Sequence, residues 1–254
     1  MRVAFSIINK LNERKYNPFL FAFFLMAIFF ISIFVRHQQL KIWDKNPTVF
    51  FVNEAPMMTT LDAPYWIGLA KSLNNGTYYK KDELRNYPDG RDILKKKHDK
   101  NASIPLEFKD KNKNSPIQST LLSQKKHETK YNNIPLLSLL ISKIVKLFNF
   151  NYFLTGTMMV PTFASMFIIP LGIYFFKIGI PLSGLLGGLI GTFSSGYYVR
   201  SSIGRIDTDM LNLFFPIFIS LMILMAAKSK TEREVLLFSI GAGLSMFLFN
   251  WWYN

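Results

Sequence analysis

The chain has 254 residues, of which 50% are hydrophobic and 16% aromatic, and its formal net charge is +14. The apolar residues, which include 25 phenylalanines, fall in blocks longer than buried strands or core helices require. Blocks of that length indicate a lipid bilayer as the solvent. The absence of cysteine excludes a disulfide scaffold, a thiolate zinc site and a cysteine nucleophile. We therefore expect an all-α polytopic membrane protein whose chemistry uses oxygen or nitrogen ligands.

A basic segment, residues 1–17, precedes an unbroken apolar run over residues 18–35. A helix over this run would rise about 27 Å, close to the thickness of the hydrocarbon core. A cleaved signal peptide would have a shorter apolar region that ends at small residues, whereas this run ends at Arg36 and His37. We interpret it as an uncleaved anchor, and the basic residues before it predict a cytoplasmic N-terminus.

A long hydrophilic stretch follows, and residues 36–133 carry 18 of the 30 Lys and Arg and 11 of the 16 Asp and Glu. The positive-inside rule weakens for loops longer than about 60 residues, so this loop is compatible with the external side. Its second half, residues 80–130, is rich in Lys, Asn and Asp without sustained periodicity, which is typical of an insertion. No aromatic stacking pattern accompanies the lysines, so we do not expect a nucleic-acid partner.

Residues 134–150 are apolar but contain Lys143 and Lys146, which favours a helix lying in the membrane interface. This choice keeps the short basic loop at 228–234 in the cytoplasm, as the positive-inside rule requires. The predicted organisation has a cytoplasmic segment at 1–17, five spans at 18–35, 152–176, 179–199, 210–227 and 235–252, external loops at 36–151 and 200–209, and a cytoplasmic loop at 228–234. The first loop, the second external loop and the end of the fifth span then share one external face.

Residues 134–254 contain only four acids, and two of them, Asp207 and Asp209, stand at the start of a predicted span. On a regular helix, side chains at i and i+2 diverge, so the pair converges only if a turn precedes the helix, and Gly204 makes such a turn plausible. Paired carboxylates supply hard oxygen ligands for Mg²⁺ or Mn²⁺. Arg200 and Arg205 flank the pair, either to neutralise a diphosphate or to form structural ion pairs with it.

A third acid, Asp62, follows the first span in an apolar setting, Thr59-Thr60-Leu61-Asp62-Ala63-Pro64. Asp62 could serve as a helix N-cap with Pro64 in the first turn, or as a ligand, and the two roles are compatible. Trp251, Trp252 and Tyr253 end the fifth span and are first interpreted as an aromatic belt at the membrane interface.

Together these segments resemble the catalytic subunit of oligosaccharyltransferase, most closely the bacterial single-subunit type. The resemblance rests on the Thr-Thr-x-Asp context of Asp62, on Asp207-Thr208-Asp209-Met210 with Arg200 seven residues upstream, and on Trp251-Trp252-Tyr253. It implies a polytopic fold like that of the GT-C glycosyltransferases. It also implies that the chain is the N-terminal portion of a larger protein and is inactive alone.

The resemblance further implies roles for individual residues. Asp62, Asp207 and Asp209 would bind Mn²⁺ or Mg²⁺ and act in catalysis, while Arg200 and Tyr253 would bind the donor. The donor would be a lipid-linked oligosaccharide on polyprenyl diphosphate, and the acceptor an asparagine in an N-x-S/T sequon of a protein. A diphosphate leaving group needs charge neutralisation, and an amide nitrogen is a poor nucleophile until its resonance is weakened.

Two alternatives stay open. Another glycosyltransferase that uses polyprenyl-linked sugars would also place an acid in the first external loop. A transporter or non-enzymatic membrane subunit would use Asp207, Asp209 and Arg205 as an ion-pair network. The composition, with its excess of Lys, Asn, Ile and Phe and no cysteine, favours a bacterial inner membrane with the site facing the periplasm.

Overall fold

The structure, a computed structural model, describes residues 17–53, 55–78, 94–95, 130–131 and 134–253. The chain divides into two compact units. In the smaller unit, residues 76–134, the strands β3 (Leu94–Lys95) and β4 (Lys130–Tyr131) pair antiparallel. The rest of the Lys-rich insertion, and the basic segment at 1–16, lie outside the described residues.

In the larger unit, residues 1–75 and 135–254, the regular elements of the described residues are helices and one small hairpin. In chain order its elements are α2 (Pro18–Asp44), α3 (Pro47–Phe50), β1 (Phe51–Val52), β2 (Ala55–Pro56), α4 (Asp62–Asn74), α5 (Leu136–Phe148), α6 (Tyr152–Ser165), α7 (Ile168–Ile178), α8 (Pro181–Phe193), α9 (Ser195–Arg200), the 3₁₀ helix η2 (Thr208–Leu211), α10 (Phe214–Lys228) and α11 (Glu232–Tyr253). Strands β1 and β2 pair antiparallel, with Phe51 opposite Pro56.

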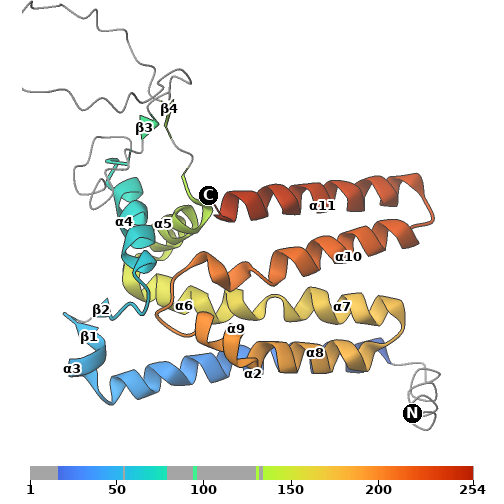
Figure 1. Cartoon of the computed structure of the whole chain (residues 1–254), viewed down its shortest axis with the longest axis horizontal. Coiled ribbons are helices and arrows are strands. Elements are labelled where there is room, and N and C mark those ends of the chain that lie inside the picture. The colour runs from blue at the N-terminus through green and yellow to red at the C-terminus, as the bar shows by residue number, and fades with distance from the viewer. Residues whose placement is uncertain (1–16, 54, 79–93, 96–129, 132–133, 254) are drawn as a thin grey trace, which may run out of the picture. The chain divides into compact units, whose positions relative to one another are not determined.

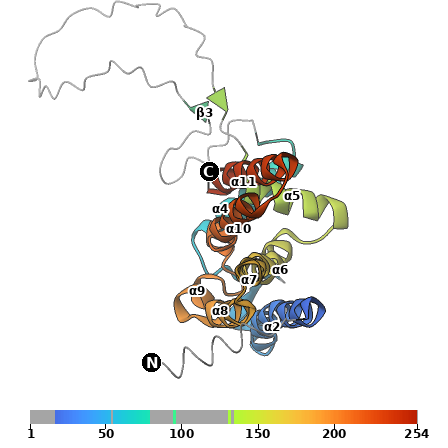
Figure 2. The ribbon, with the colours of Figure 1, turned by 90° about the vertical axis from the view of Figure 1, so that its right-hand side faces the viewer.

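The long helices of this unit run side by side, while α4 and α5 gather at one end of them (Figures 1 and 2). Helix α2 packs on α6, α7 and α8, and α10 packs on α7 and α11. Local sequence sets the helix ends: the side chains of Asn17 and Asn151 accept hydrogen bonds from the amides of Phe19 and Phe153, and Gly179 ends α7 in the left-handed region.

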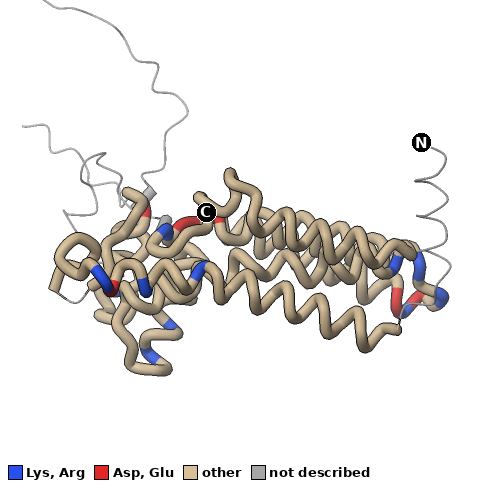
Figure 3. The backbone as a smooth tube through the Cα atoms, turned by 90° about the horizontal axis from the view of Figure 1, so that it is seen from below, with Lys and Arg blue, Asp and Glu red and all other residues tan. Residues whose placement is uncertain are grey.

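Four helical segments are long and apolar enough to cross a membrane. They are Pro18–Asp44, Tyr152–Ile178, Thr208–Lys228 and Glu232–Tyr253. Figure 3 shows the charged residues gathered toward the two ends of the helices, with an apolar length between them. Large apolar side chains on α2, α10 and α11 are exposed, as expected where lipid replaces water around a helix. The chain thus has the features of a polytopic membrane protein.

The predicted third span, residues 179–199, differs from the structure. It forms two helices, because the chain leaves helical geometry at Ser194 and restarts as α9. Ser194-Ser195-Gly196 explains the break, since Ser and Gly are weak helix formers whose polar or flexible backbone favours turns. Helix α8 has only 13 residues, fewer than the roughly 20 that a straight crossing needs.

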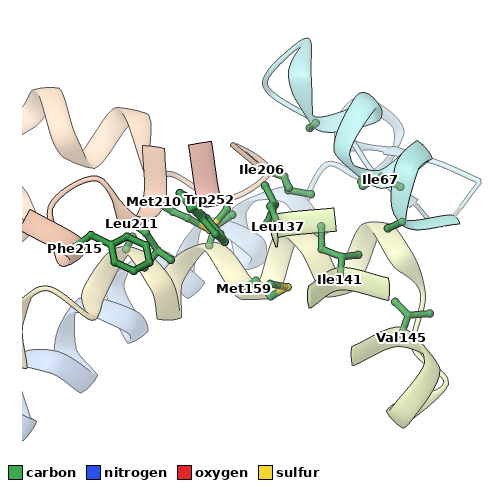
Figure 4. Close-up of a cluster of buried hydrophobic side chains, with 14 residues drawn as sticks. Ile67, Leu137, Ile141, Val145, Met159, Ile206, Met210, Leu211, Phe215 and Trp252 are labelled. Atoms are coloured by element: carbon green, nitrogen blue, oxygen red, sulfur yellow. The ribbon is translucent and has the colours of Figure 1, made fainter. Parts of the chain in front are cut away.

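A hydrophobic core lies at the end of the unit where α4 and α5 gather. Figure 4 shows Leu137 and Ile141 of α5 near Met159 of α6, with Met210, Phe215 and Trp252 grouped beside them. This core brings the first loop, the segment before α10 and the end of α11 into one packed region. Those are the three segments that carry the predicted site residues.

Candidate active site

Asp62 lies in the first turn of α4. The prediction that it serves as the N-cap is wrong: Leu61 occupies that position, and the Oγ1 of Thr60 accepts the hydrogen bond from the amide of Ala63 at 3.3 Å. Ala63 and Ile67 are buried and anchor the helix, while Asp62 is exposed. Its carboxylate accepts no hydrogen bond from any described residue, so it is available to a ligand.

Gly204 fixes the turn that carries the second acidic segment. It adopts a φ of +78°, and a Cβ there would lie 2.6 Å from the ring of Trp43 and 3.0 Å from the carbonyl oxygen of Met57. The carbonyl oxygen of Gly204 accepts a hydrogen bond of 3.1 Å from the amide of Thr59. Thr59 and Gly204 each precede an acid by three residues, so this bond ties the Asp62 loop to the Asp207 turn.

Asp207 and Asp209 lie before the regular helix, in the kind of turn that two side chains at i and i+2 need in order to converge. Asp207 is extended and caps η2, where its carboxylate accepts a hydrogen bond of 2.6 Å from the amide of Thr208. Asp209 lies one residue further, inside the 3₁₀ turn. The prediction that a turn precedes the regular α-helix agrees with the structure, because this turn is the 3₁₀ helix η2 and α10 begins only at Phe214.

Asp207 is electrostatically coupled to the other two acids. Burial raises the pKa of Asp207 above its usual value; the hydrogen bonds from Thr208 lower it, and the charges of Asp209 and Asp62 raise it further. The charge of Asp62, far away in sequence, therefore acts on the acidic pair, in keeping with the hydrogen bond that ties its loop to the turn.

Arg200 pairs with one member of this group. Its Nη1 lies 3.1 Å from Oδ2 of Asp209, while Nδ2 of Asn212 donates to Oδ1 at 2.8 Å. The Arg200 side chain is 66% exposed and the Asp209 side chain only 17%, so Arg200 retains donors toward solvent. Arg205 behaves differently: among the described residues its side chain has no hydrogen-bond or ion-pair partner, and its Nε is buried.

The aromatic residues at the end of α11 divide into two kinds. Trp252 is fully buried, and its indole Nε1 donates a hydrogen bond of 2.7 Å to the carbonyl oxygen of Thr208, between the two acids. Trp252 therefore supports the acidic turn from behind, and the aromatic-belt interpretation is wrong for it. Tyr253 is half exposed and packs edge-on against Phe249 at 5.3 Å.

Tyr253 also lines a groove of about 570 Å³ between α10 and α11. The other lining residues are Pro216, Ile219, Met246, Phe249 and Asn250. Within the described part of the chain, no hydrogen bond or ion pair joins Tyr253 to the three acids. The structure thus joins Arg200 to Asp209 and does not join Tyr253 to the acidic group.

Sequence reasoning missed a polar stripe on α2 that supports the site. Arg36 is fully buried and binds Thr192 and Ser201, and Oε1 of Gln39 accepts a hydrogen bond of 2.8 Å from the amide of Ile203. Trp43 lies against Gly204. Arg36, Gln39 and Trp43 recur at helical spacing on one face, and that spacing was the available signal.

The donor set suits a hard divalent cation in chemistry. Carboxylate oxygens are the ligands that Mg²⁺ and Mn²⁺ prefer, and a cation would relieve the repulsion from Asp209 and Asp62 that adds to burial in raising the pKa of Asp207. Among the described residues, no three acidic or histidine side chains are gathered closely enough to form a ready-made metal site. Arg200 and Asn212 already occupy oxygens of Asp209.

Comparison with known sequences agrees with this geometry. A sequence model described as "Oligosaccharyl transferase STT3, N-terminal" matches residues 127–254, which is just over half of the chain and includes both aspartates of the turn. A search of curated proteins returned no match. The chain therefore belongs to the STT3 family of oligosaccharyl transferases, membrane glycosyltransferases of polytopic GT-C fold that use lipid-linked oligosaccharide donors and protein acceptors.

Proposed function

We propose that this chain provides the acidic part of an oligosaccharyltransferase site, which transfers a glycan from a polyprenyl-diphosphate donor to asparagine in N-x-S/T sequons. The observation that carries the proposal is the convergence of two loops far apart in sequence. The Thr59–Gly204 hydrogen bond joins them, and the charges of Asp62 and Asp209 both act on Asp207. A fold that only capped two helices would have no need to tie these two acidic loops together.

Asp62, Asp207 and Asp209 are the proposed ligands of Mn²⁺ or Mg²⁺. Such an ion supplies positive charge that stabilises a departing diphosphate. Each carboxylate contributes negative charge and oxygen donors, and the buried Trp252 and the turn at Gly204 keep the backbone of the acidic segment in place. The support for a bound metal is the chemistry of its proposed ligands, which are all carboxylates.

Asp62 is proposed to orient the acceptor. Its carboxylate is exposed and without a hydrogen-bond donor among the described residues, so it is free to accept hydrogen bonds from the side-chain amide of the acceptor asparagine. Such bonds hold the amide nitrogen in place and weaken its conjugation with the carbonyl group, which raises its nucleophilicity. This role requires an acid that the protein has not already paired.

Arg200 and Tyr253 are proposed to bind the donor. Arg200 uses Nη1 for Asp209, and its exposed guanidinium keeps other N–H groups for the oxygens of a diphosphate. Tyr253 is half exposed and lines the α10–α11 groove. We further propose that this end of the molecule faces the periplasm of a bacterial inner membrane.

The proposal is tested by glycan transfer in the protein's own membranes. Asp62→Asn, Asp207→Asn and Asp209→Asn should each lower the transfer rate by at least about 100-fold, in the range seen when a preorganised charged group is removed. The matched control is Asp44→Asn, because Asp44 is exposed at the end of α2 and outside the acidic group. Transfer at the wild-type rate by Asp207→Asn would contradict the proposal.

One observation favours the structural alternative. The Arg200–Asp209 pair and the Asn212–Asp209 hydrogen bond are what a non-enzymatic polar network at a helix end would contain. Asp62 separates the two cases, because an unpaired, exposed acid adds nothing to such a network. If Asp62→Asn keeps full transfer while Asp209→Asn loses protein from the membrane, the network interpretation holds.

A further inference from the structure

Arg36 is a buried cation that no acid neutralises. It lies on α2 with no exposed surface, and no carboxylate among the described residues pairs with it. Every one of its contacts is to a neutral group, including the rings of Tyr197 and Tyr198 at 5.9 and 5.1 Å from Cζ. Leaving a charge in the interior without a counter-ion is costly, so a role beyond filling space is expected.

All three guanidinium nitrogens of Arg36 are engaged. Nε donates to the carbonyl oxygen of Ser201 at 3.2 Å, and Nη2 donates to the carbonyl oxygen of Thr192 and the Oγ of Ser201, each at 3.0 Å. Nη1 donates to Oγ of Ser32 at 2.6 Å and to Oγ1 of Thr192 at 2.9 Å. With its donors used and its surface buried, Arg36 has none left for a substrate, so any influence on the site passes through its partners.

Those partners mark the two ends of one segment. Thr192 lies in the last turn of α8, and Ser201 follows the last residue of α9. One planar group therefore fixes both ends of residues 192–201 against α2. The hydroxyl of Ser32 adds to this clamp, since it lies 2.5 Å from Oγ1 of Thr192 and 2.6 Å from Oγ of Ser165 on α6.

The clamped segment leads directly to the acids. Arg200 precedes Ser201, and its Nη1 binds Asp209 at 3.1 Å. Tyr197, which lies within the segment, donates its hydroxyl proton to the carbonyl oxygens of Ala164 and Met210, and Met210 is the residue after Asp209. Further along α2, Gln39 holds the amide of Ile203. Two routes thus connect Arg36 to the acidic turn, one through Arg200 and one through Tyr197.

We infer that Arg36 is a positioning residue: by fixing residues 192–201 on α2, its guanidinium sets where the Asp207–Asp209 turn stands relative to Asp62. The inference rests on the proposed function, because its consequence is the affinity of the three acids for a divalent cation. The planar fork is essential, since it reaches Thr192 and Ser201 at once. A lysine would keep the charge but offer a single donor centre.

The test is the affinity for Mn²⁺ of the 254-residue chain in lipid nanodiscs, measured by electron paramagnetic resonance. Arg36→Gln and Arg36→Lys should each weaken Mn²⁺ binding by about tenfold, the effect typical of residues that orient metal ligands from outside the coordination shell. Because Arg36→Lys retains the charge, a loss of Mn²⁺ affinity in this variant shows that the planar guanidinium, and not the charge, is required. Wild-type affinity in Arg36→Lys would overturn the inference.

A double variant separates positioning from a general structural role. If Arg36 acts by holding the turn against Asp62, then Arg36→Gln should weaken binding much less in an Asp62→Ala background than in the wild type. If Arg36→Gln weakens Mn²⁺ binding about tenfold in both backgrounds, so that the losses from the two substitutions multiply, the inference is contradicted. The matched control is Leu221→Ala, which removes a buried side chain of α10 outside both apolar clusters and should leave Mn²⁺ affinity unchanged.

Hydrogen–deuterium exchange tests the positioning role of Arg36 without any metal, because it measures how often the amides of the turn open. In Arg36→Gln and Arg36→Lys, amides of residues 201–208 should exchange at least tenfold faster, while those of α10 keep the wild-type rate. If Asp207→Ala leaves Mn²⁺ binding unchanged, the proposed metal site fails, and the exchange of residues 201–208 alone decides the role of Arg36. Wild-type exchange across these residues would then overturn it.

Discussion

The two halves of α2 contact neighbouring helices through different interactions, apolar packing in one half and hydrogen bonds in the other. In the N-terminal half, Phe21 and Leu25 pack in an apolar cluster with Phe167 and Ile168, and Leu25 lies against Gly172. In the C-terminal half, Ser32, Arg36 and Gln39 form hydrogen bonds to α8, α9 and the turn beyond. Apolar contacts tolerate small shifts, whereas hydrogen bonds fix direction, so the directional half is the one beside the acids.

The largest expected effect comes from Gly204→Ala, which breaks the directional half. An added Cβ would lie 2.6 Å from the ring of Trp43 at a φ of +78°, so strain and overpacking together should lower the free energy of unfolding by roughly 2–5 kcal/mol. Steric trapping in bicelles measures it. Gly196→Ala is the control, because that site has free space and no positive φ, and it should be neutral or slightly stabilising.

Gly184→Ala disturbs the packing of α8 on α7 at Gly172, the glycine that also meets Leu25 of the apolar half. Its Cβ would lie 2.9 Å from Cβ of Phe175 and 3.1 Å from Cα of Gly172, so α7 and α8 must separate, with a loss of about 1–3 kcal/mol in the free energy of unfolding. Because this contact lies in the apolar half, the Mn²⁺ affinity of the folded protein should stay unchanged. A loss of affinity as large as that of Arg36→Gln would remove the distinction between the two halves.

Trp252→Phe tests the support behind the acids. The substitution keeps an aromatic ring but leaves the carbonyl oxygen of Thr208 without its buried donor, which should lower the free energy of unfolding by about 1–2 kcal/mol. Tyr253→Phe is the companion variant, since its ring is half exposed. It should leave stability unchanged and weaken only donor binding, read as a rise in KM for the lipid-linked donor.

The smallest expected effect is a dependence of the free energy of unfolding on pH, which arises from the titration of Asp207. Its pKa is raised in the folded protein, so the folded state binds this proton more tightly than the unfolded state. The resulting stabilisation is complete below the unfolded pKa and is lost as pH rises through the folded pKa. Asp207→Asn should remove this component from unfolding curves recorded in EDTA between about pH 3 and 7. An unchanged pH profile in the variant would show that Asp207 is not the titrating group.

The helices and the turn before the acids can be predicted from the sequence, because each depends on neighbouring residues in the chain. Long apolar runs predict the helices, and Gly204 before Asp207 predicts the turn that the structure has. The hydrogen bond that Thr60, and not Asp62, accepts at the start of α4 was less visible, because both residues suit a helix start and only backbone geometry chooses between them.

Features that depend on what a side chain faces could not be predicted. Helical spacing places Arg36 on one face with Gln39 and Trp43, but a sequence does not reveal that Thr192 and Ser201 will surround its side chain. Trp252 looks like an interfacial ring for the same reason, although it is buried against Thr208. The break at Ser194 depends on a balance between weak helix propensity and the packing of α9, and packing is absent from a single sequence.

The central claim is that Asp62, Asp207 and Asp209 form one divalent-cation site, and Mn²⁺ titration of the chain in nanodiscs tests it most directly. The account predicts one bound ion per chain, with affinity reduced at least tenfold by each of Asp62→Ala, Asp207→Ala and Asp209→Ala and unchanged by Asp44→Asn. A bound ion whose affinity is indifferent to Asp62, or no bound ion at all, would contradict it.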